Sequence, residues 1–204
     1  LRAYEPNVGR TVGELARAMG IDAGSKQYVS RVVRRALGQV RTEAWAREFD
    51  ELGITVKTVV AGPDALPHEA IPFPAFRYRE LAGETWEESD LRDRIGRFLF
   101  LPMVGRRGLA NADDAVLRRP FFWSPSSSDR TGIEREWTMF RDEIIAGRAD
   151  RLPTAASTTY IHVRPKAADS KDTDLAPIVG PVVKKAFWLN KGLIQRLLRE
   201  HGGW

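Results

Sequence analysis

The stretch "EFDELGITVKTVV" (Glu48–Val60) decides how the rest of this sequence is interpreted. It reads as a turn followed by a run of β-branched residues, which predicts a β-strand. Thr55 and Lys57 lie two residues apart, so their side chains share one face of that strand. Metal-dependent nucleases place an acid and a lysine at this spacing, because carboxylates hold Mg²⁺ and a cation supports the charge of the transition state. Threonine is neutral and a poor Mg²⁺ ligand, so the strand has the form of a nuclease centre without its acid.

The composition bounds the class of protein. The chain has 204 residues, 43% hydrophobic and 29% charged, which is enough for one sizeable globular domain or two small ones. No apolar run reaches transmembrane length, and no signal-peptide pattern is present. The absence of cysteine excludes disulfides and thiolate metal sites and fits an intracellular protein. The formal net charge of +5 favours an anionic partner. Because the sequence starts at Leu1, we expect a fragment of a longer protein.

The remaining segments predict a mixed α/β (α+β) domain. Thr11 and Glu14 have the spacing of a capping box that opens a helix. We predict helices over 11–20, 26–38, 86–96, 129–146 and the C-terminal segment after Asn190, which is a candidate N-cap. We predict strands over 53–62, 73–81, 97–104, 158–165 and from 184 to the C-terminal helix. Segments 105–120 and 166–181 are expected to be loops, and "FFWSPSSS" (121–128) a turn.

Two groups of residues indicate nucleic-acid binding without any family argument. The helices over 11–20 and 26–38 have the length of a helix-turn-helix, whose second helix would place Ser30, Arg31, Arg34 and Arg35 in a major groove. The alternative is a helical hairpin packed on a sheet. Arg164 and Lys166 flank a proline beside a strand end, and with Trp188 they form a rigid basic element suited to base edges and phosphates. The three histidines, His68, His162 and His201, lack the spacing of a zinc site.

Nine segments, in this order, resemble the MutH/Sau3AI family of DNA endonucleases. They are "TVGELARAMGI", "YVSRVVRRALG", "ELGITVKTV", "HEAIPFPAFRYREL", "TWEESDLRDRI", "FLFLPMV", "FFWSPSSSDR", "IHVRPKAADSK" and "AFWLNKGLIQRLL", which together span about residues 11–198. The family recognises GATC and belongs to the restriction-endonuclease-like superfamily. The resemblance therefore implies a MutH-like core with a central mixed β-sheet flanked by helices. "IPFPAFRY" is closer to the Sau3AI restriction enzyme branch than to the mismatch-repair branch.

The resemblance also assigns roles to individual positions. Arg34 stands where the family has a catalytic helix Glu, Glu48 where it has an Asp, and Thr55 where it has the strand Glu. Lys57 keeps the strand lysine, and Lys26 matches an upstream lysine. Two of three carboxylates are therefore replaced, one of them by a cation. Arg34 beside Lys57 would repel Mg²⁺, so this is a pseudo-active site unless Glu14, Glu43, Asp50 or Glu69 has taken over as an acid.

The DNA-contacting set implied by the resemblance and by the basic clusters is Arg164, Pro165, Lys166, Lys184, Lys185, Trp188 and Lys191. The family resemblance makes the second helix part of the nuclease centre, which weakens the helix-turn-helix interpretation.

Three functions follow as hypotheses. The first is a single domain over 1–204, the C-terminal effector domain of a Sau3AI-like type II restriction enzyme. It would bind double-stranded DNA without a cofactor and promote cleavage by a catalytic domain in the same chain. The second is an active Mg²⁺-dependent endonuclease using Glu48 or Asp50 with Lys57. The third is a helix-turn-helix regulator. We expect a bacterial cytoplasmic protein, at the nucleoid when bound, with no membrane partner. The recognition sequence and any methylation preference stay open.

Overall fold

The computed structural model describes residues 1–23, 27–38, 49 and 51–204. The chain divides into two compact units, each made from separate stretches of sequence. The first unit comprises Leu1–Glu69, Arg97–Ser124 and Ile194–Trp204, and the second comprises Ala70–Gly96 and Pro125–Leu193. The prediction of one DNA-binding domain over 1–204 stays a prediction.

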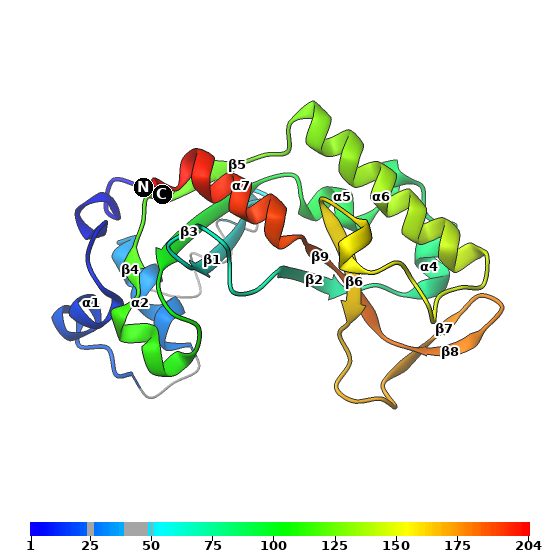
Figure 1. Ribbon diagram of the computed structural model, residues 1–204, viewed down its shortest axis with the longest axis horizontal. Helices are drawn as coiled ribbons and strands as arrows, with labels where there is room; N and C mark the ends of the chain where they lie inside the picture. The colour runs from blue at the N-terminus through cyan, green and yellow to red at the C-terminus, as the bar shows by residue number, and fades with distance from the viewer. Residues whose placement is uncertain (24–26, 39–48, 50) are drawn as a thin grey trace. The chain divides into compact units, whose positions relative to one another are not determined.

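The first unit contains a mixed sheet in the order β1-β3-β4, in which β5 also pairs with β3 (Figure 1). Strands β1 and β3 are parallel, whereas β4 and β5 run antiparallel to β3. The elements of this unit are η1 (Glu5–Asn7), α1 (Val12–Met19), α2 (Tyr28–Ala36), β1 (Thr55–Ala61), β3 (Phe98–Val104), η3 (Leu109–Asp114), β4 (Val116–Leu117), β5 (Phe121–Trp123) and most of α7 (Lys191–His201).

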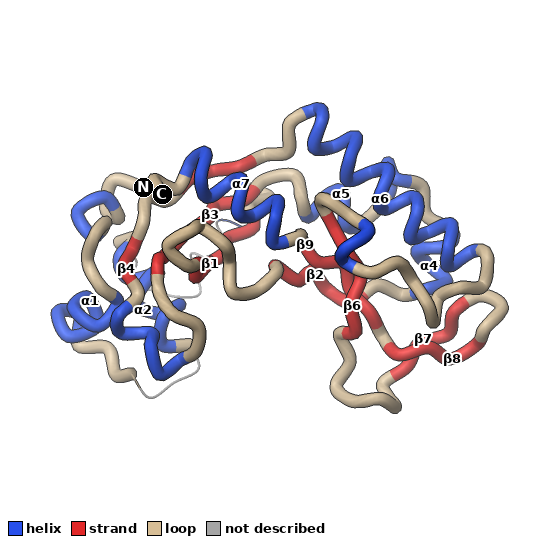
Figure 2. The backbone as a smooth tube through the Cα atoms, in the orientation of Figure 1, coloured by secondary structure: helices blue, strands red, loops and turns tan. Residues whose placement is uncertain are grey.

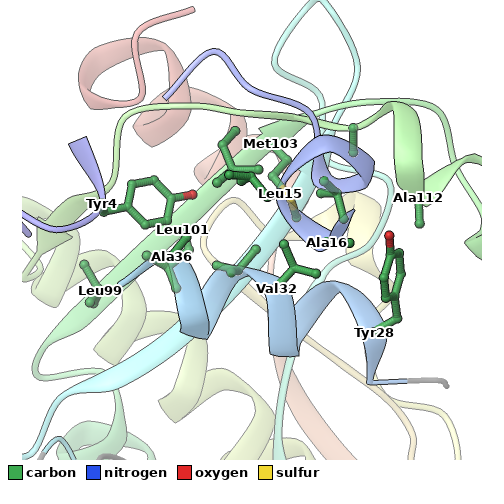
Figure 3. Close-up of a cluster of buried hydrophobic side chains, with 14 residues drawn as sticks. Tyr4, Leu15, Ala16, Tyr28, Val32, Ala36, Leu99, Leu101, Met103 and Ala112 are labelled. Atoms are coloured by element: carbon green, nitrogen blue, oxygen red, sulfur yellow. The ribbon is translucent and has the colours of Figure 1, made fainter. Parts of the chain in front are cut away.

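Helices α1 and α2 form a core with one face of this sheet. The Thr11 side chain accepts the Glu14 N–H at 3.1 Å, and the Glu14 carboxylate accepts the Thr11 N–H, so the predicted capping box is present. Leu15, Val32 and Leu101 are fully buried and lie together (Figure 3). Burying a side chain of this size contributes roughly 1.5–3 kcal/mol, which fixes the helix pair on the sheet.

The alternation of side chains between the two faces of β3 shows towards which face each β1 side chain points. Leu99, Leu101 and Met103 belong to the helix-side core, and Val56 and Val60 of β1 pack against that same core. Because neighbours along a strand face opposite sides, Thr55 and Lys57 lie on the other face. Register confirms this, since Thr55 pairs with Phe98 and Lys57 with Phe100, whose rings stack on each other with centroids 5.5 Å apart.

The second unit contains a three-stranded antiparallel sheet in the order β2-β9-β6 and a separate β7-β8 hairpin (Figure 2). Its elements are β2 (Ile71–Ala75), α4 (Tyr78–Gly83), η2 (Trp86–Glu88), α5 (Asp90–Arg94), α6 (Ser127–Ile145), η4 (Ala155–Ser157), β6 (Ile161–Pro165), β7 (Thr173–Ala176), β8 (Gly180–Val183) and β9 (Lys185–Leu189).

Helix α6 covers one face of this sheet. The Phe140 ring meets the Phe187 ring with centroids 5.9 Å apart. A Cβ atom added at Gly132 of α6 would lie 2.2 Å from the Tyr160 ring, so only glycine permits this close approach. The buried Glu136 carboxylate accepts the backbone N–H groups of Thr159, Tyr160 and Ile161 at 2.7–2.9 Å. The entry of β6 is therefore fixed to α6 by one carboxylate.

The predicted fold class is confirmed, and four local predictions are wrong. Segment 73–81 is strand only to Ala75, and helix α4 begins at Tyr78. The Tyr78 N–H is accepted by the Asp174 carboxylate, and its hydroxyl donates to the Val183 carbonyl, so distant residues set this boundary. Segments 105–120 and 166–181 contain η3, β4, β7 and the start of β8, and 121–123 is strand β5. These strands have two to four residues and depend on a pairing partner that local sequence does not reveal.

Substituting Glu136 by Gln should destabilise the protein by roughly 2 kcal/mol. In the native structure the Glu136 carboxylate accepts hydrogen bonds from three backbone N–H groups. The glutamine side chain would turn an NH₂ group, itself a donor, towards some of these N–H groups. The change is measured by urea denaturation. Glu134→Gln on the same helix is the control and should change the free energy of unfolding by no more than about 0.5 kcal/mol. Equal effects of the two substitutions would show that the three N–H contacts do not support the fold.

Candidate nucleic-acid interface

The structure brings Thr55 and Lys57 together on one face of β1, as predicted. Arg34 lies half-buried on α2, a helix whose Val32 and Val33 side chains pack towards the opposite face of the sheet. Three other predicted positions, Lys26, Glu48 and Asp50, lie outside the described residues. The structure thus places the neutral Thr55 beside Lys57, whereas Arg34 lies on a helix that packs against the opposite face of the sheet. The upstream acids lie outside the described residues.

Two of the alternative acids, Glu14 and Glu69, make contacts away from Thr55 and Lys57. The Glu14 carboxylate is part of the capping box. The exposed Glu69 carboxylate lies 3.7 Å from the exposed Arg107 guanidinium. Glu43 lies outside the described residues. Within 1–23, 27–38, 49 and 51–204, no group of three His, Asp or Glu side chains is placed to hold a metal ion. The described residues at this centre do not fit Mg²⁺, because they offer a hydroxyl and positive charge.

The face of the β2-β9-β6 sheet opposite α6 is polar. Alternation places His162 and Arg164 of β6 on this face, directly opposite Trp188 and Ala186 of β9. The Arg164 guanidinium lies 5.6 Å from the centroid of the Trp188 ring, a cation–π distance. The Trp188 Nε1–H has no acceptor within the described part of the chain. We call His162, Arg164, Trp188 and Asn190 the polar sheet face.

Lys166 extends this face beyond the end of β6. Its backbone N–H donates to the Lys184 carbonyl at 2.9 Å, and its ammonium donates to the Phe73 carbonyl at 2.5 Å. The side chain is nevertheless exposed, as are Arg164 and Pro165. The predicted Arg-Pro-Lys element is therefore anchored through the backbone N–H and the ammonium of Lys166, and its three side chains are exposed.

Three further predicted lysines have different surroundings. Lys185 faces α6, is 9% exposed, and donates to the Ala149 carbonyl at 2.7 Å. Burial lowers the pKa of its ammonium. Lys184 pairs with Asp172 at 2.5 Å, and this hydrogen bond lowers the pKa of the carboxyl. Lys191 is exposed at the start of α7. Lys185 thus lies on the opposite face from Arg164, and we leave it out of the interface.

Sequence reasoning missed His162 and Asn190 as members of the polar sheet face. The His162 ring is 3% exposed, and its Nδ1 bonds the Asn190 carboxamide oxygen. Asn190 also donates to the carbonyl of Thr158 at 2.9 Å. The one available signal was the spacing of His162 two residues before Arg164 on a predicted strand.

The mixed sheet with its parallel β1–β3 pair carrying Lys57, the antiparallel β2-β9-β6 sheet and the flanking helices are consistent with a restriction-endonuclease-like α/β fold. Residues 41–136 match the family described as DNA mismatch repair enzyme MutH. The chain is 28% identical to the DNA mismatch repair protein MutH of Escherichia coli and to that of Shigella flexneri, over 95% of this chain and 87% of each relative. The MutH of Serratia proteamaculans (strain 568) is also 28% identical, over 95% of this chain and 88% of the relative.

The match over residues 41–136 and the 28% identity over 95% of the chain support a MutH-like endonuclease family for this chain. The family resemblance found in the sequence is thereby confirmed. Its placement in the Sau3AI branch and the loss of the catalytic acids stay predictions. Along the described residues, no helix is long and apolar enough to cross a membrane.

The stability of the protein should fall as the pH is lowered through about 6.5, the ordinary pKa of histidine. Burial is the main cause that lowers the pKa of His162 in the folded protein, so the unfolded chain binds this proton more readily. The free energy of unfolding therefore decreases as pH falls from 7.5 towards 5.5. Urea denaturation of the parent and of His162→Gln at both pH values checks this. An unchanged pH dependence in the variant would contradict it.

Proposed function

We propose that this protein is a catalytically degenerate MutH-like domain that binds double-stranded DNA. The polar sheet face carries the proposal, because it presents Arg164 stacked on Trp188 beside an anchored, exposed Lys166. Arginine and lysine on a rigid element contact phosphates and guanine edges, and an aromatic ring supports the guanidinium. The orphan Trp188 N–H adds a donor that a ligand could engage after a small side-chain movement.

The loss of catalysis is inferred from charge. Hydrolysis of a phosphodiester with Mg²⁺ needs carboxylates to hold the ion. Thr55 stands at the strand position of an acid, and Arg34 stands at the helix position of another. By the family resemblance, each replacement removes one of the negative charges that would hold Mg²⁺, while Lys57 is kept. Positive charge without carboxylates binds a phosphate backbone and does not retain a divalent cation.

The finer function is that of an effector domain. DNA bound on the polar sheet face would favour the cleaving state of a separate catalytic nuclease domain in the same protein, as in a Sau3AI-like restriction enzyme. GATC is the recognition sequence that the family resemblance favours. A gel-shift comparison of GATC, scrambled and adenine-methylated GATC duplexes tests both sequence and modification. A bacterial cytoplasmic location, at the nucleoid when bound, belongs to the same proposal.

Lys166→Ala should weaken duplex binding by roughly 1–3 kcal/mol if the ammonium contacts a base, or reduce the salt slope by about one if it contacts a phosphate. Binding is measured without metal over a salt series, where each neutralised phosphate contributes about −0.9 to the slope. Arg135→Ala is the matched control, because Arg135 is exposed on α6, behind the sheet. Lys185→Met should also keep the parent affinity, provided that the variant is folded.

The same series separates a helix-turn-helix regulator from this proposal. The structure leaves Arg31 exposed on α2, so that alternative predicts loss of binding in Arg31→Ala. Loss in Arg31→Ala with full affinity in Lys166→Ala and Trp188→Ala would overturn the polar sheet face as the interface.

The protein should not nick supercoiled DNA in the presence of Mg²⁺ or Mn²⁺, because the described centre lacks metal-binding carboxylates. Agarose electrophoresis of plasmid after long incubation measures this, with Lys57→Ala as the comparison. Metal-dependent cleavage that disappears in Lys57→Ala would establish the competing function. In that case Glu48 or Asp50 supplies the acid of an active endonuclease with a rearranged site.

A further inference from the structure

A cavity of about 490 Å³ opens on the polar sheet face, entirely within the second unit. Its lining includes Thr158, His162, Arg164, Asn190 and the first two residues of α7, Lys191 and Gly192. His162 and Asn190 have no part in the nuclease centre. Their burial and their mutual hydrogen bond show that the cavity wall is built from ordered polar groups.

The hydrogen bonds of Asn190 define the tautomer of His162. The Asn190 Nδ2 donates to the Thr158 carbonyl at 2.9 Å and to the Thr158 hydroxyl at 3.1 Å. The Asn190 carboxamide oxygen therefore faces the ring and accepts from Nδ1–H. A neutral imidazole carries one proton, so Nε2 is left with a lone pair. That atom has no partner within the described residues, although the ring is 97% buried and lines the cavity.

The charged side chains that line the cavity are those of Arg164 and Lys191, and both are positive. The Arg164 guanidinium forms no ion pair with a carboxylate in the described chain, and it is held over Trp188. Lys191 and Gly192 open an 11-residue helix, whose first N–H groups and dipole favour an anion. Among the described residues, no acid lines the cavity. Glu136 lies on the α6 side of the sheet and accepts from backbone.

We propose that this cavity binds a phosphate group, held by Arg164 and the start of α7, with one proton shared between His162 Nε2 and a phosphate oxygen. Inorganic phosphate brings this proton as its own P–OH. A phosphate monoester does so only as the monoanion, because its second pKa is about 6, and as the dianion it leaves His162 to take the proton from solvent. A phosphodiester carries none at neutral pH, so His162 takes the proton from solvent on binding. The site stands on its own geometry, whereas its use for a DNA phosphate rests on the proposed function.

The proton makes binding depend on pH with a defined sign. The charged groups that face His162 are Arg164 of β6 and Lys191 of α7, and Trp188 of β9 is neutral. Burial lowers the pKa of His162, the Asn190 contact opposes this, and Arg164 lowers it further. A bound phosphate offsets Arg164 and accepts from Nε2–H, which raises the pKa. Phosphodiester affinity should therefore increase as pH falls from 8 to 6, by up to about tenfold per pH unit.

The test follows the His162 C2–H resonance by NMR between pH 6 and 8 at constant ionic strength. The probes are inorganic phosphate, sulfate as an anion without a transferable proton near neutral pH, and a short duplex. We expect phosphate to shift the resonance and raise the pKa of His162. The His201 resonance, in the other unit, should not move and serves as the internal control.

Each outcome decides the proposal. A raised His162 pKa with phosphate and duplex supports a site that also takes the DNA backbone. A response to phosphate alone assigns a free or terminal phosphate, and the site then stands even if gel shifts show no DNA binding. A response to duplex alone assigns a backbone phosphodiester. Equal binding of sulfate and phosphate without a change in the His162 pKa, or no response to any probe, overturns the proposal.

Two variants keep the test independent of folding. His162→Gln should retain weakened binding and lose its pH dependence. Should His162→Gln fail to fold, Lys191→Ala leaves the His162–Asn190 pair in place and should lower phosphate affinity several-fold while the His162 pKa still rises on binding. Unchanged affinity in a folded Lys191→Ala protein would contradict the proposed arrangement. Arg135→Ala is the matched control for loss of one charge.

Discussion

Burial of strand β3 on both faces is the constraint on which the first unit depends. Six of its seven residues are buried, and they alternate between the α1–α2 core and an aromatic layer with Trp123 and Phe121. Each buried side chain contributes roughly 1.5–3 kcal/mol, so a shift of one residue would be costly on both sides. The parallel register with β1 is thereby fixed, and with it the face on which Thr55 and Lys57 lie.

In the second unit, side chains alternate along the strands, so the residues that pack on α6 and the residues proposed to contact DNA lie on opposite faces of the sheet. Odd-numbered residues of β9 face α6, where Phe187 packs on Phe140 and Lys185 is buried. Even-numbered residues face away, where Trp188 supports Arg164. The Glu136 carboxylate holds the entry of β6. One face of the sheet is thus held by apolar packing against α6, and the opposite face is polar, positively charged and open to a ligand.

In the proposed function, the two units would carry different parts of a nuclease-derived domain. One would keep the strand, the lysine and the helix pair of a MutH-like centre, with Thr55 and Arg34 in place of two acids. The other keeps a basic, aromatic-supported face. Losing carboxylates would remove metal binding, while the remaining positive charge would still attract phosphates. A protein of this family can therefore lose cleavage while duplex binding persists, which is the physical basis of the effector proposal.

The sequence by itself determined the elements with strong local signals. These include the capping box of α1, the β-branched run of β1, the apolar run of β3 and the strand that ends at Pro165. It also showed the MutH-like resemblance and singled out Arg164 and Lys166 as candidate DNA contacts, since these depend on residue identity and order. Short strands β4, β5 and β7, and helix α4, required partners far along the chain. Only the tertiary structure decided that Lys185 is buried and that His162 meets Asn190, because strand pairing and burial, not local sequence, determine which side chains share a face.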